Sequence, residues 1–137
     1  MPKKPQPPIS KKRLTSLEFV KDLPKFDNQI EHIADHFDVE KEEIWKELCV
    51  LTKLPNLATP IPNQNPLRKF RVRIPGKTGK SGGLRVICVI ADDIKRIVPL
   101  HIFTKCEKED LTMKEYEKLR KEYEEIIEDL KANLKKI

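Results

Sequence analysis

The sequence predicts an α+β fold in which a small antiparallel sheet packs against helices. Residues 68–74 alternate apolar and basic side chains, as a strand with one buried face does. Residues 84–91 and 95–105 are apolar runs bounded by turn residues, as in a buried hairpin. Two segments before these strands and one after them carry apolar residues at helical spacing. The predicted order is β-α-α-β-β-β-α, which defines a layered fold of helices on a sheet.

Length and composition indicate one small domain. The chain has 137 residues, of which 38% are hydrophobic and 36% charged, so we expect a thin core under a charged surface. Four prolines and two lysines in residues 1–10 predict a flexible tail, which leaves residues 11–137 as the folded domain. No apolar run approaches the ~20 residues of a spanning helix, and none follows the basic N-terminus as in a signal peptide. We therefore expect a cytoplasmic protein without a membrane partner.

The first half of the domain predicts one strand and a helical hairpin. Residues 12–20 alternate imperfectly and are assigned to the first strand. Asp27 is a candidate N-cap for a helix over 28–37, and Asp38 is a candidate N-cap for a second helix over about 39–53. Each segment carries a single apolar stripe: Ile30, Ile33, Ala34 and Phe37 in the first, and Ile44, Trp45, Leu48 and Leu51 in the second.

A Pro- and Asn-rich loop over 54–67 precedes the basic strand at 68–74. Successive side chains of a strand point to opposite faces, so the alternation separates an apolar face from a basic one. The apolar face holds Phe70, Val72 and Ile74, and the basic face holds Lys69, Arg71 and Arg73.

The remaining elements are a hairpin and a long helix. A Gly- and Lys-rich loop over 75–83 leads into the strand at 84–91, and the chain then turns and returns at 95–105. Thr112 and Glu115 match the capping-box pattern T-x-x-E, which predicts a helix from there to about residue 135.

Charge is concentrated in blocks along the chain. Residues 27–64 hold three Lys/Arg and eight Asp/Glu, a net charge of −5. Residues 65–108 hold eleven Lys/Arg and three Asp/Glu, a net charge of +8. A basic block of this kind indicates a surface that binds a polyanion such as RNA.

Four cations of this block are predicted to converge. Lys69 and Arg71 lie on one strand face, Arg85 begins the next strand and Lys105 ends the third. Neighbouring strands would bring the four side chains to one patch, although like charges repel. A bound phosphodiester would stabilise such an arrangement, because guanidinium and ammonium groups neutralise its oxygens. Arg73 lies on the same face and is a further RNA-binding candidate.

The loop GKTGKSGG contains the strings G-K-T and G-K-S, but it is not a Walker loop. That motif requires G-x-x-x-x-G-K-[ST] between a strand and a helix, whereas a strand follows here. Lys77 and Lys80 are candidates for binding RNA phosphates, and a flexible hairpin connection without a ligand is the alternative.

Metal-binding patterns are weak. Cys49, Cys88 and Cys106 are spaced neither for a disulfide framework nor for a zinc site. His32 and His36 share one helix face, but no third ligand is evident. We therefore expect no metal and no cofactor.

Three ordered motifs resemble the RelE/HigB-like toxins of type II toxin–antitoxin systems. They are the strand motif R-K-x-R at residues 68–71, the loop and strand motif G-K-x-G-G-x-R-V-I at 79–87, and K-x-E-K-E-D-L-[ST] at 105–112. The resemblance implies a RelE-like fold. It also implies a metal-independent endoribonuclease that cleaves mRNA, usually on the ribosome, and is neutralised by a cognate antitoxin.

The resemblance also implies roles for the matched residues. Lys69 and Arg71 would activate or position the RNA 2′-hydroxyl, Arg85 would stabilise charge on the phosphate, and Lys105 would be a second clamp or a proton donor. Many relatives carry Tyr two residues before this lysine, where this chain has Phe103. Phe can stack on a base but cannot donate a proton, and His101 is a possible substitute donor. A non-catalytic RNA-binding module, or a domain that binds only proteins, therefore remains an alternative.

Overall fold

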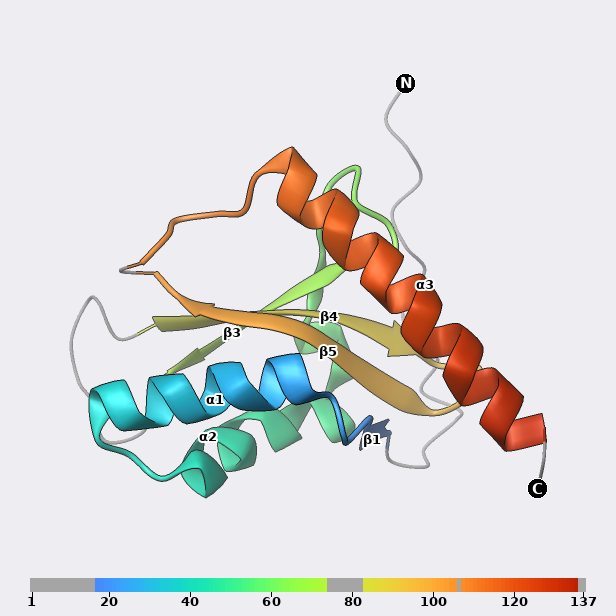
Figure 1. Ribbon diagram of the computed structural model, residues 1–137. Coiled ribbons are helices and arrows are strands. Elements are labelled where there is room, and N and C mark those ends of the chain that lie inside the picture. Colours follow the sequence, from blue (N-terminus) through green and yellow to red (C-terminus); the bar gives the residue numbers. More distant parts are fainter. Residues whose placement is uncertain (1–16, 74–82, 106, 136–137) are drawn as a thin grey trace.

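The computed structural model describes residues 17–73, 83–105 and 107–135, which form an α+β fold (Figure 1). A five-stranded sheet in the order β1-β5-β4-β3-β2 separates two helical layers, with α1 and α2 on one face and α3 on the other. None of the described helices is long and apolar enough to cross a membrane. The elements in chain order are β1 (Glu18–Phe19), α1 (Pro24–Phe37), α2 (Lys41–Leu48), the 3-10 helices η1 (Cys49–Thr52) and η2 (Pro55–Leu57), β2 (Thr59–Pro60), β3 (Arg68–Arg73), β4 (Gly83–Ala91), β5 (Arg96–Thr104) and α3 (Met113–Lys135).

The two edges of the sheet differ from the prediction. The first strand, predicted over 12–20, is present in the described residues only at Glu18–Phe19, and it pairs in parallel with β5. The sheet is therefore mixed and not antiparallel throughout. Parallel neighbours need a long connection, and here two helices and three strands lie between β1 and β5. The opposite edge strand, β2, was not predicted, because two residues within a Pro-rich loop carry no alternation.

Both helix starts in the first half also differ from the prediction. Helix α1 begins at Pro24. Proline suits the first position of a helix, because the backbone N–H that it lacks would have no partner there and its φ is already helical. Asp27 therefore lies in the first turn and is not the N-cap. Asp38 is the left-handed C-cap of α1, with φ of 55°, and the N-cap of α2 is Glu40. Helix α2 ends at Leu48 and continues as a 3-10 helix, so the second helix is shorter than predicted.

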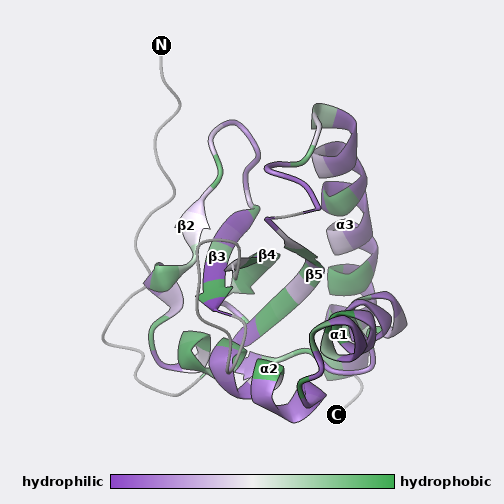
Figure 2. Cartoon of the chain, turned by 90° about the vertical axis from the view of Figure 1, so that its left-hand side faces the viewer, coloured by the Kyte–Doolittle hydropathy of each residue, from purple (hydrophilic) through white to green (hydrophobic). Residues whose placement is uncertain are grey.

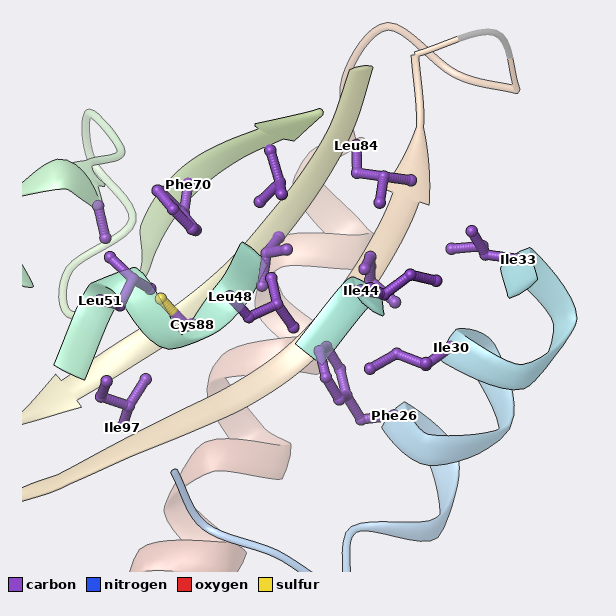
Figure 3. Packing of buried hydrophobic residues seen from close by; sticks show 14 of the residues in the cluster. Phe26, Ile30, Ile33, Ile44, Leu48, Leu51, Phe70, Leu84, Cys88 and Ile97 are labelled. Atoms are coloured by element: carbon purple, nitrogen blue, oxygen red, sulfur yellow. The ribbon is translucent and has the colours of Figure 1, made fainter. Parts of the chain in front are cut away.

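The hairpin of β4 and β5 is buried on both faces, as its apolar runs predicted. One core cluster fills the space between the sheet and the pair α1 and α2 (Figure 3). A second cluster lies between the opposite face and α3. Strand β4 alternates between them: Leu84, Val86 and Cys88 face the first cluster, and Ile87 and Val89 face the second.

The predicted capping box of α3 is present. The Glu115 backbone N–H donates to Thr112 Oγ1 at 3.2 Å, and the Thr112 backbone N–H donates to Glu115 Oε1 at 2.9 Å. Two backbone donors that a helix start leaves unbonded are thus satisfied reciprocally. Tyr116 and Leu119, about one and two helical turns beyond Thr112, are buried against the sheet.

Leu48 tests the packing of the first cluster. Its side chain is fully buried, so Leu48→Ala should lower the free energy of unfolding by roughly 2–5 kcal/mol through lost burial and a cavity. Val50, two residues further along the chain, is 45% exposed, and Val50→Ala should change stability by about 0.5 kcal/mol or less. Denaturant titration of both variants measures the difference, and equal losses would contradict this packing.

Candidate nucleic-acid interface

Strand β3 divides its side chains as its alternation predicted. Phe70 and Val72 are 6% and 7% exposed and join the core under α2. Lys69, Arg71 and Arg73 occupy the opposite face, where the two arginines are exposed and Lys69 is half-buried. The burial of the two apolar residues therefore decides which way the three cations point.

The pairing of β3 with β4 brings the cations together. Arg71 is the direct cross-strand partner of Arg85. Two pairs further towards the end of the sheet, Arg73 lies opposite Gly83, and the backbone N–H of Lys105 donates to the Gly83 carbonyl at 3.1 Å. Adjacent strands are roughly 4.8 Å apart, so Arg73 and Lys105 flank the Arg71–Arg85 pair at one end of the sheet.

The Arg85 guanidinium lies close to Gly83. A Cβ atom at Gly83 would lie 2.7 Å from Arg85 Nη1, so a larger residue at this position would require the guanidinium to shift. Partial burial and the charge of Arg71 lower the pKa of Arg85, which remains a cation at neutral pH. Within the described residues, no carboxylate forms an ion pair with Arg71 or Arg85. The two cations therefore face each other without a counter-charge.

Lys69, in contrast, has an internal partner. Its Nζ lies 3.1 Å from Asp110 Oδ1, and the same oxygen accepts hydrogen bonds from the Leu111 backbone N–H at 2.8 Å and from the Tyr116 hydroxyl. Partial burial favours the protonated form of Asp110, but these three donors outweigh it and lower the pKa of Asp110. A phosphate or hydroxyl that approaches Lys69 has to compete with this carboxylate.

A groove of about 750 Å³ runs along β3, and Lys69, Arg71 and Arg73 are among the residues that line it. Figure 2 shows α3 over the β5 side of the sheet, away from β2 and β3. No helix therefore covers the cations of β3 in the described part of the chain. The groove is lined by Glu47 and Val50, by the segment 57–62 (except Ala58), by residues 69–73 of β3 and by Asp110.

Other sequence candidates occupy different positions. Arg68 lies on the apolar side of β3, is 5% exposed and donates from Nη1 to the Ala58 carbonyl at 2.8 Å, so it belongs to the core. Phe103 is 4% exposed within the second cluster, so it offers no open face for stacking on a base. Lys77 and Lys80 lie outside the described residues.

His101 lies beside Phe103, with ring centroids 5.6 Å apart, as their shared strand parity predicted. Its Nδ1 is 2.9 Å from Nε2 of Gln29 on α1. Sequence reasoning assigned no role to Gln29 or Asp110, because each acts on a residue more than 40 positions away. Asp110 was visible only as a letter of the third motif.

The described residues contain no group of three or more His, Cys, Asp or Glu side chains that could hold a metal ion. The Cys88 thiol is fully buried, which raises its pKa to about 12 and makes it a core residue. Comparison of the chain with protein-family models finds no match, and comparison with curated proteins finds none either.

The segment between β5 and α3 contributes a pH-dependent ion pair. Hydrogen bonds from Lys108 and from the Thr112 backbone N–H lower the pKa of Glu115 from 4.5 to about 2. A carboxyl group whose pKa falls on folding stabilises the protein above its unfolded pKa and ceases to do so as pH falls through the folded pKa. The stabilisation is therefore complete above about pH 4.5 and is lost towards pH 2.

Glu115→Gln should remove this contribution. The free energy of unfolding should fall less between about pH 6 and about pH 3 than it does in the wild type. Lys108→Met should reduce the pH dependence in the same direction, because it removes the main partner. Denaturant titrations at the two pH values measure the change, and a wild-type slope in both variants would show that this pair does not set it.

Proposed function

We propose that the chain is a toxin-type endoribonuclease that cleaves mRNA on the ribosome and is neutralised by a cognate antitoxin, with a RelE-like fold. The observation that carries the proposal is the Arg71–Arg85 pair. Directly opposed like charges destabilise a sheet by roughly 0.2–1 kcal/mol, and neither guanidinium has a carboxylate partner in the described residues. A phosphate anion between them would turn this repulsion into attraction.

The proposed chemistry needs no metal ion. The RNA 2′-hydroxyl gives its proton to solvent and its oxygen forms a bond to the adjacent phosphorus as the P–O5′ bond breaks. The 5′-oxygen takes up a proton, so the products are a 2′,3′-cyclic phosphate and a 5′-hydroxyl. Charge grows on the phosphoryl oxygens in the transition state, and Arg85 with Arg71 is placed to stabilise it. Lys69 positions the attacking side of the sugar and exchanges Asp110 for RNA when substrate binds. The exposed Lys105 at the end of β5 is the candidate proton donor to the leaving oxygen.

Arg85→Ala tests the assignment. It should lower the rate of mRNA cleavage roughly 10²–10³-fold, as loss of one transition-state donor does. Stability in low salt should stay the same or rise, because the repulsion from Arg71 disappears. Arg96→Ala is the matched control, since Arg96 lies on the same sheet at the far end of β5 and should leave cleavage unchanged.

A ribosome-dependent cleavage assay measures the cleavage rate of both variants, and thermal unfolding measures their stability. Wild-type cleavage by Arg85→Ala would refute the site. Equal loss in both variants would point to a general charge effect and not to this position.

Binding of single-stranded RNA should depend steeply on salt. Each phosphate neutralised on a single strand contributes roughly −0.7 to the slope of log K against log salt. One phosphate between Arg71 and Arg85, one at Arg73 and one at Lys105 therefore predict a slope of roughly −2.1. Arg85→Ala should make the slope shallower by roughly 0.7. Fluorescence anisotropy at several salt concentrations measures both values. A flat dependence would favour a domain that binds only proteins.

One observation favours a second candidate function, a non-catalytic RNA-binding module. Phe103 stands where many toxins of this type carry Tyr, and its ring is buried, so it contributes neither a proton nor a stacking face. This candidate shares the salt dependence above but leaves mRNA intact. The ribosome-dependent cleavage assay therefore separates the two.

A further inference from the structure

Gln29 of α1 closes part of the open edge of β5. Strand β1 pairs only with Arg96 and Ile97, so the later residues of β5 have no strand neighbour on that side among the described residues. The backbone N–H of Ile102 donates instead to Gln29 Oε1 at 3.0 Å. A backbone N–H can only donate, so this contact identifies the Gln29 oxygen and leaves its NH₂ group facing His101.

This orientation assigns the hydrogen on the imidazole ring. The Gln29 NH₂ group lies 2.9 Å from His101 Nδ1, and an amide NH₂ can only donate, so Nδ1 accepts. A neutral imidazole with an accepting Nδ1 carries its hydrogen on Nε2. Burial, then the charge of Lys25, lower the pKa of His101, with Lys108 acting in the same direction and Glu115 and Glu122 opposing. His101 is therefore a neutral ring that presents an Nε2–H donor.

His101 lines an open recess, and its Nε2–H group is accessible. Every buried side-chain nitrogen or oxygen among the described residues has a hydrogen-bond partner. Nε2 of His101 has no hydrogen-bond partner among these residues, so it is not buried and is accessible. The opening that the ring lines is a recess of about 270 Å³ between α1 and the end of β5. The other polar side chains around it are Asn28, His32 and Glu107, and they are exposed.

The recess pairs a fixed donor with a carboxylate. On its Watson–Crick edge guanine offers the O6 acceptor beside the N1–H and N2–H donors, so a donor and an acceptor-only carboxylate match it. Adenine presents an N6–H donor and an N1 acceptor, the reverse order.

We propose that this recess is a subsite for a guanine base of the RNA, with His101 Nε2–H on O6 and Glu107 on N1–H and N2–H. Its position relative to the cations supports the assignment, because Phe103 lines the recess and is the cross-strand partner of Arg85. The recess therefore lies beside β4, the strand that carries Arg85. The inference rests on the proposed RNA-binding function and adds a base preference to it.

The test uses short single-stranded RNA with 2′-O-methyl groups, which cannot be cleaved. One position carries guanine, inosine (which lacks the N2 amino group) or adenine, and fluorescence anisotropy measures binding to the full chain. Wild-type protein should bind in the order guanine, inosine, adenine, with roughly 10-fold or more between the first and the last. Glu107→Gln and His101→Phe should each remove most of this difference, and Glu109→Gln, an exposed carboxylate two residues from Glu107, should keep it.

Each outcome of this binding test either supports or overturns the guanine subsite. Wild-type binding without a base preference, or a preference retained in both variants, overturns the subsite even where the same preparation cleaves mRNA. No binding of any oligonucleotide together with no cleavage overturns the proposed function as well. Because His101→Phe risks misfolding, nitrogen-15 NMR of the wild-type ring gives an independent reading. It should show the hydrogen on Nε2, and a hydrogen on Nδ1 would overturn the assignment.

Discussion

The register between β3 and β4 is the constraint on which the site depends. A one-residue slip would move every side chain of β3 to the other face of the sheet. Such a slip would expose Phe70 and Val72 and bury Arg71 and Arg73 among the apolar residues under α2. Burial of the apolar pair thus holds Arg71 opposite Arg85, and the functional face follows from core packing on the reverse side of the same strand.

The sequence predicted well the features that follow from a local pattern of residues. The alternation of β3, the two-sided burial of β4 and β5, and the capping box of α3 each depend on residues a few positions apart. What it predicted poorly are features decided by distant contacts. Asp is a common N-cap residue, yet Asp38 is the C-cap of α1, because the chain adopts a left-handed conformation there. Arg68 was not assigned to either face of the strand, and the structure buries it on the side of Phe70.

The segment that follows β5 shows why a motif residue need not be a catalytic residue. Asp110 and Glu115 lie in or beside the third motif, and both accept hydrogen bonds from residues at the start of α3. Asp110 accepts from Tyr116 and from the backbone of Leu111, while it also holds Lys69. A pattern match alone cannot separate these roles, since attachment of the helix and placement of a lysine require the same carboxylate.

These contacts divide the cations of the interface into two groups. Lys69 has an acidic partner, whereas Arg71 and Arg85 face each other across the strands with none in the described residues. An arriving phosphate should therefore meet the arginine pair first, where binding relieves a repulsion and breaks no ion pair. Lys69 would follow only when the RNA displaces Asp110. Under the proposed function, this order of engagement would make the arginines the determinants of affinity for RNA, and it would make Lys69 responsive to how well the bound RNA is positioned.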